Sequence, residues 1–146
     1  IMTRPHPVTV ILLSAASLFC LSLTAATASP GRQANADPKS ILDRIYSVAQ
    51  AGRGEQRFKV SCSSCHRLDE FAGNLFAERW NGQTMGEVFE FVSNAMPEND
   101  PGGLTPGQYA DVLAYILRIN GYPVGAADMP ADKAALKAYA VVPNPK

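Results

Sequence analysis

Two cysteines and a histidine lie together in one short run. The run reads Cys62-Ser63-Ser64-Cys65-His66, which is the C-x-x-C-H pattern. Two thiols at this spacing can add across the two vinyl groups of a haem and hold one edge of the ring covalently. The imidazole that follows is a good iron ligand, and the covalent tether lowers the entropy cost of keeping it bound. The pattern therefore predicts one covalently bound haem c, with Cys62 and Cys65 as thioether attachments and His66 as an axial iron ligand.

Three other uses of the two thiols remain open. A structural zinc site needs four ligands and usually a second Cys/His pair. A thioredoxin-like redox pair calls for a surrounding βαβ pattern, whereas no run of β-branched residues here is typical of a parallel sheet. A small structural disulfide is the third use, and it requires an oxidising compartment.

The first thirty residues have the three parts of a secretory signal peptide. Arg4 and His6 give a positive start, residues 8–23 carry no charge, and residues 26–28 read Ala-Thr-Ala. An uncharged stretch of sixteen residues is short against the roughly 20 that a membrane span needs. We therefore expect residues 1–28 to be removed during export to the periplasm, leaving no stable membrane span.

Removal of the signal peptide narrows the choice of a second iron ligand. It takes away His6 and Cys20 and leaves His66 as the single histidine. Two histidine ligands from one chain are then excluded, and methionine is the remaining good ligand. Three methionines remain: Met85, Met96 and Met129. A lone methionine is usually core filler, which is the ordinary explanation for Met85 at the start of a predicted helix.

Met96 is the methionine that the sequence favours as the second axial ligand. It lies 30 residues after His66, which is enough chain to pass around the ring edge and return over the far face. Pro97 biases Met96 toward an extended backbone. Residues 101–103 read Pro-Gly-Gly, which is typical of a turn. Glycines at this place allow the backbone to lie close to a flat ligand.

Apolar residues at helical spacing predict an all-α fold. The predicted helices run from Asp37-Pro38 toward Val48, over residues 49–61, from the capping box Thr84–Glu87 through Val92, and from the capping box Thr105–Gln108 to Asn120. Gly121 is placed as a left-handed cap after the last of them. Residues 67–80 and 94–104 are predicted to be loops around the haem.

The length and composition suit one domain. The chain has 146 residues, of which 47% are hydrophobic and 18% charged, and this leaves little room for a second core. Its formal net charge is +0, which argues against the broad basic surface of a nucleic-acid binder. We expect a flexible segment at 29–37, the haem domain at 38–125, and a tail at 126–146 that packs on or near the domain.

The order of these blocks resembles class I cytochrome c, the small monohaem electron carriers with His/Met ligation, of the type found with bacterial periplasmic dehydrogenases. The resemblance covers roughly residues 40–125 and is carried by Tyr46–Gly54, Phe58, the C-x-x-C-H run, Trp80, Met96–Glu98, Pro101–Leu104, Tyr109–Leu117 and Asn120–Pro123. The resemblance implies the class I cytochrome c fold, in which three to five helices wrap around one covalently bound haem. In that family the first and last helices cross near the haem, with a glycine at the closest approach. Gly54, Phe58 and Tyr115 match the crossing positions.

One feature departs from the family pattern. Class I cytochromes commonly carry a proline soon after the haem histidine, and its carbonyl accepts the Nδ1–H of that histidine. No proline follows His66 at that distance. Such a bond fixes the ring and strengthens the ligand. Another carbonyl in residues 67–76 could substitute for that of the proline, and the sequence leaves the acceptor open. Arg67, Asp69 and Glu70 are expected to be solvated loop charges.

The expected function is electron transfer rather than catalysis. An iron with both axial positions filled by protein has no open site for substrate. The chain is expected to be an exported carrier that cycles between Fe(III) and Fe(II), taking electrons from a periplasmic dehydrogenase and passing them to an oxidase or another cytochrome. It would act as a monomer or as an enzyme subunit. Glu98 and Asp100 would either border the exposed haem edge and favour a basic partner, or be ordinary solvated acids.

Two functions of other classes remain as alternatives. The first is a haem-based sensor or catalyst in which Met96 is displaced by a small ligand. The second is a thiol redox protein without haem that uses Cys62 and Cys65.

Overall fold

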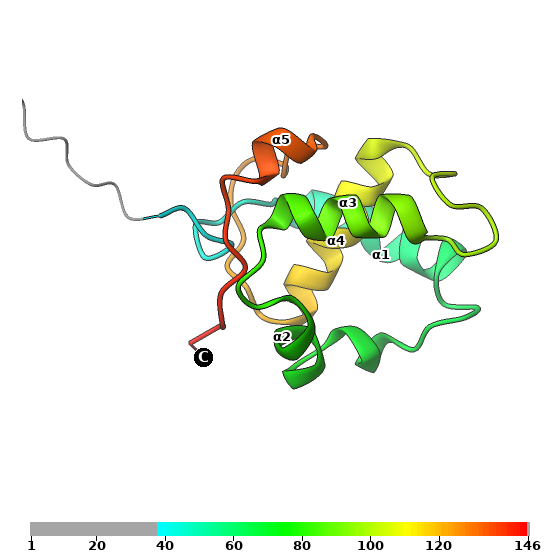
Figure 1. Cartoon of the computed structure of the whole chain (residues 1–146), viewed down its shortest axis with the longest axis horizontal. Helices are drawn as coiled ribbons and strands as arrows, with labels where there is room; N and C mark the ends of the chain where they lie inside the picture. Colours follow the sequence, from blue (N-terminus) through cyan, green and yellow to red (C-terminus); the bar gives the residue numbers. More distant parts are fainter. Residues whose placement is uncertain (1–37, 146) are drawn as a thin grey trace, which may run out of the picture. The chain divides into compact units, whose positions relative to one another are not determined.

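The computed structural model describes residues 38–145, and the predicted signal peptide (1–28) and segment 29–37 lie outside this range. The described residues form helices without a named strand, which confirms the all-α prediction (Figure 1). The helices are α1 (Val48–Ser61), the 3₁₀ helix η1 (Leu68–Phe71), α2 (Asn74–Trp80), α3 (Met85–Ala95), α4 (Pro106–Ile119) and α5 (Lys133–Leu136). Within residues 38–145, none of these helices has the length and apolar character that a membrane crossing requires.

Helices α1 and α4 pack directly against each other, and Gly54 lies at their closest approach (Figure 1). A Cβ atom at Gly54 would lie 1.8 Å from the carbonyl oxygen of Asp111, so only glycine allows this separation of the two backbones. One turn further along, the rings of Phe58 and Tyr115 have centroids 5.7 Å apart. The crossing expected at Gly54, Phe58 and Tyr115 is therefore confirmed.

Two helices begin where their capping boxes predict. Thr84 accepts a hydrogen bond from the backbone N–H of Glu87, and the Glu87 carboxylate accepts one from the N–H of Thr84. Thr105 and Gln108 make the same reciprocal pair at the start of α4. Each pair satisfies N–H groups that the first helical turn leaves without a partner. At the other end of α4, Gly121 has φ +72°, which confirms the predicted left-handed cap.

The segment before α1 is not helical, so the helix predicted from Pro38 is wrong. The Asp43 carboxylate accepts a hydrogen bond of 2.6 Å from the N–H of Ser40, which closes a turn. The N–H of Ile41 then donates to the carbonyl of Ala140 at 3.0 Å. Short polar side chains that bond to nearby backbone compete with helix formation. Here the turn and the pairing with the tail replace the helix, while Ile41 is still fully buried.

Residues 67–80 are not a loop, because they contain η1 and α2. Phe76 and Trp80 are both buried, and they lie four residues apart on one face of α2. This apolar stripe binds the short helix to the rest of the domain. By contrast, the predicted loop at 94–104 is present from Met96 onward, since α3 ends at Ala95.

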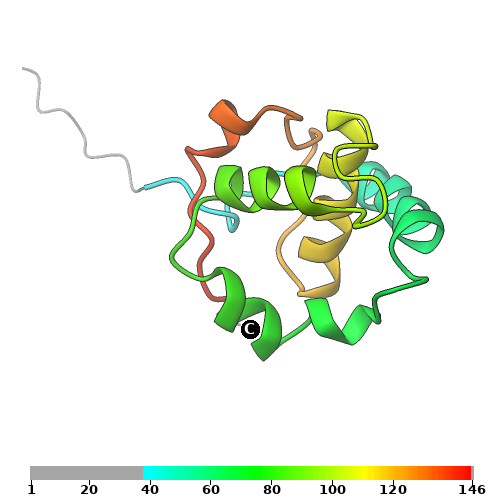
Figure 2. The same ribbon diagram turned by 45° about the vertical axis from the view of Figure 1, so that its right-hand side comes forward.

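The residues after α4 complete the hydrophobic core. Met129, Leu136 and Val141 are at most 2% exposed. The tail runs beside the beginning of α3 toward α2 (Figure 2). There the carbonyl of Tyr139 accepts from Met85 N–H, with N and O 2.8 Å apart. Helix α5 packs against α3.

Candidate haem site

The C-x-x-C-H run forms a tight turn at the end of α1. The N–H of Cys62 continues the helix by donating to the carbonyl of Phe58 at 2.9 Å. The carbonyl of Cys62 then accepts from both Cys65 and His66, with N···O distances of 3.2 and 3.0 Å. Cys62 is half-buried and Cys65 exposed, and both thiols are free. The turn therefore places two separate thiols and the imidazole within one loop of backbone.

The surroundings of the Cys62 thiol differ from those of a redox-active cysteine, and no zinc site is formed among the described residues. Burial raises the pKa of the Cys62 thiol, and the nearby charge of Arg57 opposes this only in part. Redox-active cysteines instead have a lowered pKa. In residues 38–145 no group of three or more His, Cys, Asp and Glu side chains is arranged to hold a metal ion, whereas a structural zinc needs four such ligands.

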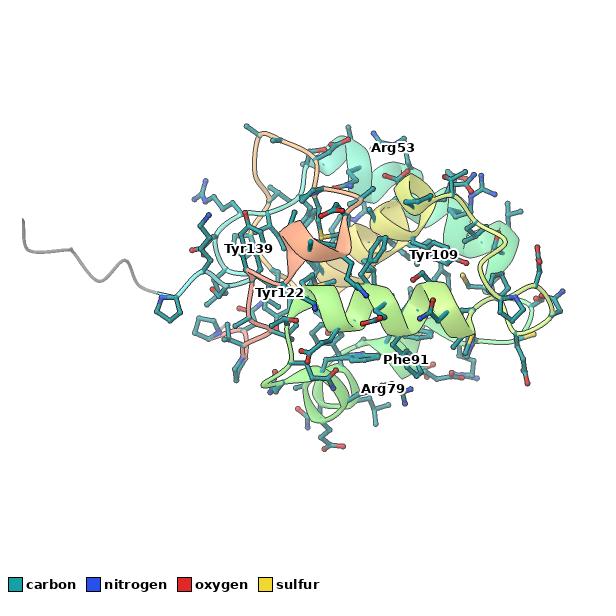
Figure 3. All side chains as sticks on the ribbon, turned by 45° about the horizontal axis from the view of Figure 1, so that its top comes forward. Arg53, Arg79, Phe91, Tyr109, Tyr122 and Tyr139 are labelled. Atoms are coloured by element: carbon teal, nitrogen blue, oxygen red, sulfur yellow. The ribbon has the colours of Figure 1, made fainter. Side chains whose placement is uncertain are left out.

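An apolar cavity lies inside the domain between η1, α2, α3 and α4. All the side chains that line it are hydrophobic: Phe71, Phe76, Trp80, Met85, Val88, Val92, Leu113, Ile116 and Leu117. On the α2–α3 side, Trp80 packs edge-on against Phe91 with ring centroids 5.4 Å apart. The guanidinium of Arg79 covers both rings at 5.0 Å, and Figure 3 shows Arg79 and Phe91 side by side. Such walls suit a large flat apolar group.

The ring of His66 lies against one wall of this cavity. Its centroid is 5.2 Å from that of Phe71, with the planes at 71°. Phe71 in turn meets Phe58 edge to face at 5.6 Å. Because Phe71 lines the cavity and Phe58 is buried on α1, this chain of rings places the predicted iron ligand beside the apolar space.

The partner of the His66 Nδ1 atom is the carboxylate of Glu70 at 3.1 Å. The sequence left the acceptor of this bond open, and the structure shows a side-chain carboxylate in that place. Glu70 is exposed, as expected of a solvated charge, and also contacts His66. The second carboxylate oxygen of Glu70 accepts from the N–H of Arg67 at 3.1 Å. Hydrogen bonds from His66 and from this N–H lower the pKa of Glu70. The spacing of four residues from His66 was the sequence signal for this pair.

Met96 is the C-terminal cap of α3 and has the extended backbone expected before Pro97, with φ −127° and ψ 150°. Its N–H donates to the carbonyl of Val92 at 3.0 Å, and Val92 lines the cavity. The hydroxyl of Tyr109 donates to the carbonyl of Met96 at 2.6 Å and accepts from the N–H of Leu104 at 3.4 Å. Tyr109, labelled in Figure 3, thus joins the two ends of the Met96 loop, a role that the sequence analysis missed.

The other two methionines lie in different surroundings. Met129 is far from the haem motif, because its backbone N–H and carbonyl both bond to the side chain of Gln50. Gln50 precedes Cys62 by twelve residues along α1, which at 1.5 Å per residue is about 18 Å. Met85 is buried and lines the cavity itself. Of the three methionines, Met85 is the one that lines the cavity, and Met96 follows the cavity residue Val92 by four positions.

These residues fit a covalently attached haem. They offer two free thiols and an imidazole in one turn, a cavity with only apolar walls, and a methionine on the loop after α3. The buried apolar shell excludes water from such a group and sets its electrostatic surroundings.

Comparison with known proteins assigns the family. Residues 49–116 match the model of the family described as Cytochrome C oxidase, cbb3-type, subunit III. The match runs from α1 through most of α4 and includes the C-x-x-C-H turn and the Met96 loop. No curated protein and no solved structure matched the chain. A domain of this kind binds haem c covalently and exchanges electrons with protein partners. The chain therefore carries a monohaem class I cytochrome c domain.

Proposed function

We propose that the domain is an exported electron carrier in which Cys62 and Cys65 hold the haem by thioether bonds and His66 and Met96 are its axial ligands. The observation that carries the proposal is the C-x-x-C-H turn, in which two thiols and the His66 imidazole lie together, with the His66 ring against Phe71, a residue that lines the apolar cavity. The haem supplies the one-electron Fe(III)/Fe(II) couple.

The protein's own residues favour electron transfer over catalysis. Two protein side chains on the axial positions leave no open coordination position for a substrate or a signal molecule. The methionine thioether favours a higher potential than a second histidine would. The packed α1–α4 crossing and the Tyr109 hydrogen bonds hold both ligand-bearing segments in place. A change of oxidation state then needs little rearrangement of the protein.

The proposed electron donor is a periplasmic dehydrogenase, and the proposed acceptor is a terminal oxidase or another cytochrome. The signal-peptide pattern of residues 1–28 supports a periplasmic location, as does haem attachment, which takes place outside the cytoplasm. Glu98 and Asp100 are exposed on the loop that follows Met96. Two carboxylates at this place favour a partner with a basic surface.

The first experiment is an absorption spectrum of the protein matured in the periplasm, recorded in the oxidised form and after reduction with dithionite. Sharp α and β bands on reduction, with a weak near-infrared band in the oxidised form, are expected for low-spin His/Met haem. A broad high-spin spectrum that responds to carbon monoxide would support the sensor or catalyst instead. If no haem absorption band is seen although the maturation system works, the result would support a thiol redox protein without haem that uses Cys62 and Cys65.

Replacement of the methionines identifies the second ligand. Met96→Ala is expected to keep the covalent haem and to lose the Met–Fe(III) charge-transfer band in the near infrared. The matched control is Met85→Leu, which keeps the volume of a fully buried side chain at a cost of less than about 1.5 kcal/mol and is expected to retain the band. The reverse pattern would assign the ligand to Met85.

A further inference from the structure

The carboxylate of Glu70 is held in place by two hydrogen bonds. One oxygen lies 3.1 Å from Nδ1 of His66, and the other lies 3.1 Å from the backbone nitrogen of Arg67. The second bond satisfies the backbone N–H of Arg67, the residue that precedes η1. A carboxylate fixed to the backbone in this way needs little further ordering to bond the imidazole.

The negative charge of Glu70 is not shared with the nearest arginine side chain. The guanidinium of Arg67 instead pairs with Asp69, at 3.0 and 3.1 Å. These two opposite charges largely cancel each other. The charge of Glu70 also acts on Arg67, but the side-chain hydrogen bond of its carboxylate is with His66.

The ring of His66 is also positioned from the other side. Phe71 meets it edge to face, and Phe58 supports Phe71 from α1. The His66 side chain is 31% exposed and that of Glu70 is 46% exposed. The hydrogen bond therefore lies at the edge of the domain, where water and salt weaken the charge without removing the contact.

We propose that Glu70 is a positioning residue that accepts the Nδ1–H of the axial His66 and lowers the reduction potential of the haem. This inference rests on the proposed function, in which His66 ligates the iron. With Nε2 of His66 as the iron-binding atom, the neutral imidazole would carry its proton on Nδ1, and this N–H would donate a hydrogen bond to the carboxylate of Glu70.

The sign of the effect follows from charge. A carboxylate bonded to Nδ1–H makes the imidazole a stronger electron donor, and a stronger donor stabilises Fe(III) relative to Fe(II). The negative charge also favours the oxidised centre, which carries one more positive charge. Both effects lower the reduction potential of the haem, whereas the methionine ligand raises it.

The test is the midpoint potential of the haem-loaded protein at pH 7 and fixed ionic strength, measured in Glu70→Gln and Glu98→Gln. Glutamine keeps an oxygen that can accept from the Arg67 N–H, so the 3₁₀ helix is retained while the charge is lost. Glu98→Gln makes the same change two residues after Met96, away from His66. A rise in potential is expected in Glu70→Gln and a clearly smaller one in Glu98→Gln.

The second measurement is the Nδ1 proton of His66 in protein labelled with ¹⁵N-histidine and held in the diamagnetic ferrous state. Its resonance is expected to move to lower frequency in Glu70→Gln, because an amide is a weaker acceptor than a carboxylate, and to stay in place in Glu98→Gln. The proposal would be overturned by equal shifts of the midpoint potential in the two variants. It would also be overturned if the chemical shift of the Nδ1 proton were the same in Glu70→Gln as in the wild type. The wild-type spectrum is the separate test of the proposed function, so the two failures are distinguishable.

Discussion

At the scale of single residues, two side chains outside the haem motif hold the predicted ligands in place. Glu70 contacts His66 through its carboxylate, and Tyr109 contacts Met96 through its hydroxyl. Neither contact is with the ligand atom expected to bind iron. Both restrict how far the ligand-bearing segment can move, which matters because a ligand that is already placed loses less entropy on binding.

Tyr109→Phe is predicted to weaken the hold on the Met96 loop. The change removes the bonds to the Met96 carbonyl and to the Leu104 N–H and keeps the buried ring. Loss of a hydrogen bond of this kind costs about 0.5–1.5 kcal/mol of unfolding free energy. The Met–Fe(III) band is expected to disappear at a lower temperature than in the wild type, as followed by near-infrared absorption during heating.

Tyr122→Phe is the matched control. It removes a tyrosine hydroxyl that donates to the carbonyl of Val142 at 2.7 Å, in the part of the domain next to the tail. The unfolding free energy of Tyr122→Phe is expected to fall by a similar amount. Its Met–Fe(III) band is expected to disappear only when the whole domain unfolds. The role of Tyr109 would be contradicted if the band in Tyr109→Phe, as in Tyr122→Phe, disappeared only at the temperature of global unfolding.

At the scale of elements, the sequence signals that act within one helix are reliable here. The capping boxes at Thr84 and Thr105 start α3 and α4. Helix α1 covers the predicted residues 49–61 and begins one residue earlier, at Val48. Each signal depends on side chains three or four residues apart, so the local sequence contains all the interacting groups.

The wrongly predicted elements depend on distant partners. The segment before α1 has apolar residues at helical spacing, yet Ile41 pairs with Ala140 of the tail. Helix α2 was missed because seven residues carry a weak periodic signal, and its formation depends on the burial of Phe76 and Trp80. Tertiary packing supplies most of the stability of such a short helix.

Gly54→Ala is predicted to destabilise the α1–α4 crossing. The new Cβ would lie 1.8 Å from the Asp111 carbonyl oxygen and 2.9 Å from Cβ of Tyr115, so the two helices must separate. Overpacking of this kind costs typically about 1–3 kcal/mol, and occasionally more. Urea denaturation of the haem-loaded protein, followed by far-ultraviolet circular dichroism, measures the loss.

Gly52→Ala provides the control on the same helix. A Cβ at Gly52 meets nothing within 4 Å, and replacement of a helical glycine by alanine is expected to stabilise by roughly 0.5–1 kcal/mol. The two alanines should therefore move the urea midpoint in opposite directions. A shift of the same sign in both would refute the close-approach argument.

At the scale of the whole domain, one cluster of charges connects three parts of the chain that are distant in sequence. Arg53 of α1 bonds to Asp111 of α4 at 2.9 Å and to Asp128 of the tail at 2.6 Å. Asp128 also accepts a hydrogen bond from Ser47, the N-cap of α1. The cluster holds the tail against the end of α1 that is farther from the haem motif.

Asp128→Asn is predicted to lower stability in a manner that depends on pH. The hydrogen bond from Ser47 and then that from Arg53 lower the pKa of Asp128 below its ordinary value of 3.8. The stabilisation is therefore complete well above pH 3.8 and is lost as pH falls through the folded-state pKa. Because Asp128 is 47% exposed, the contribution is expected to stay below about 1 kcal/mol.

The measurement is the urea midpoint of wild type and Asp128→Asn from pH 7 down to pH 2. The wild type should be the more stable at neutral pH, and the two midpoints should converge as the wild-type carboxylate becomes protonated. A difference that stays constant down to pH 2 would show that the ionised carboxylate does not provide the stabilisation.

The sequence by itself determined the family, the cofactor and the helical class of this protein. Covalent attachment depends on residues that are neighbours in the chain, so the Cys62–His66 run suffices to predict it. Met96 was chosen as the second ligand because the predicted signal-peptide cleavage leaves one histidine and because of its distance from His66 and its position before Pro97. It stays a prediction that the Met96→Ala spectrum tests.

Tertiary structure alone decided what surrounds those ligands. The contact of Tyr109 with Met96 crosses thirteen residues, and the bonds of Met129 to Gln50 cross 79. Glu70 lies only four residues from His66, yet its direction depends on η1, which the sequence analysis took for a loop. Which polar group meets a ligand depends on how the helices pack. A buried hydroxyl such as that of Tyr109 must find a partner within reach, and the exposed Glu70 meets His66 because η1 places it there.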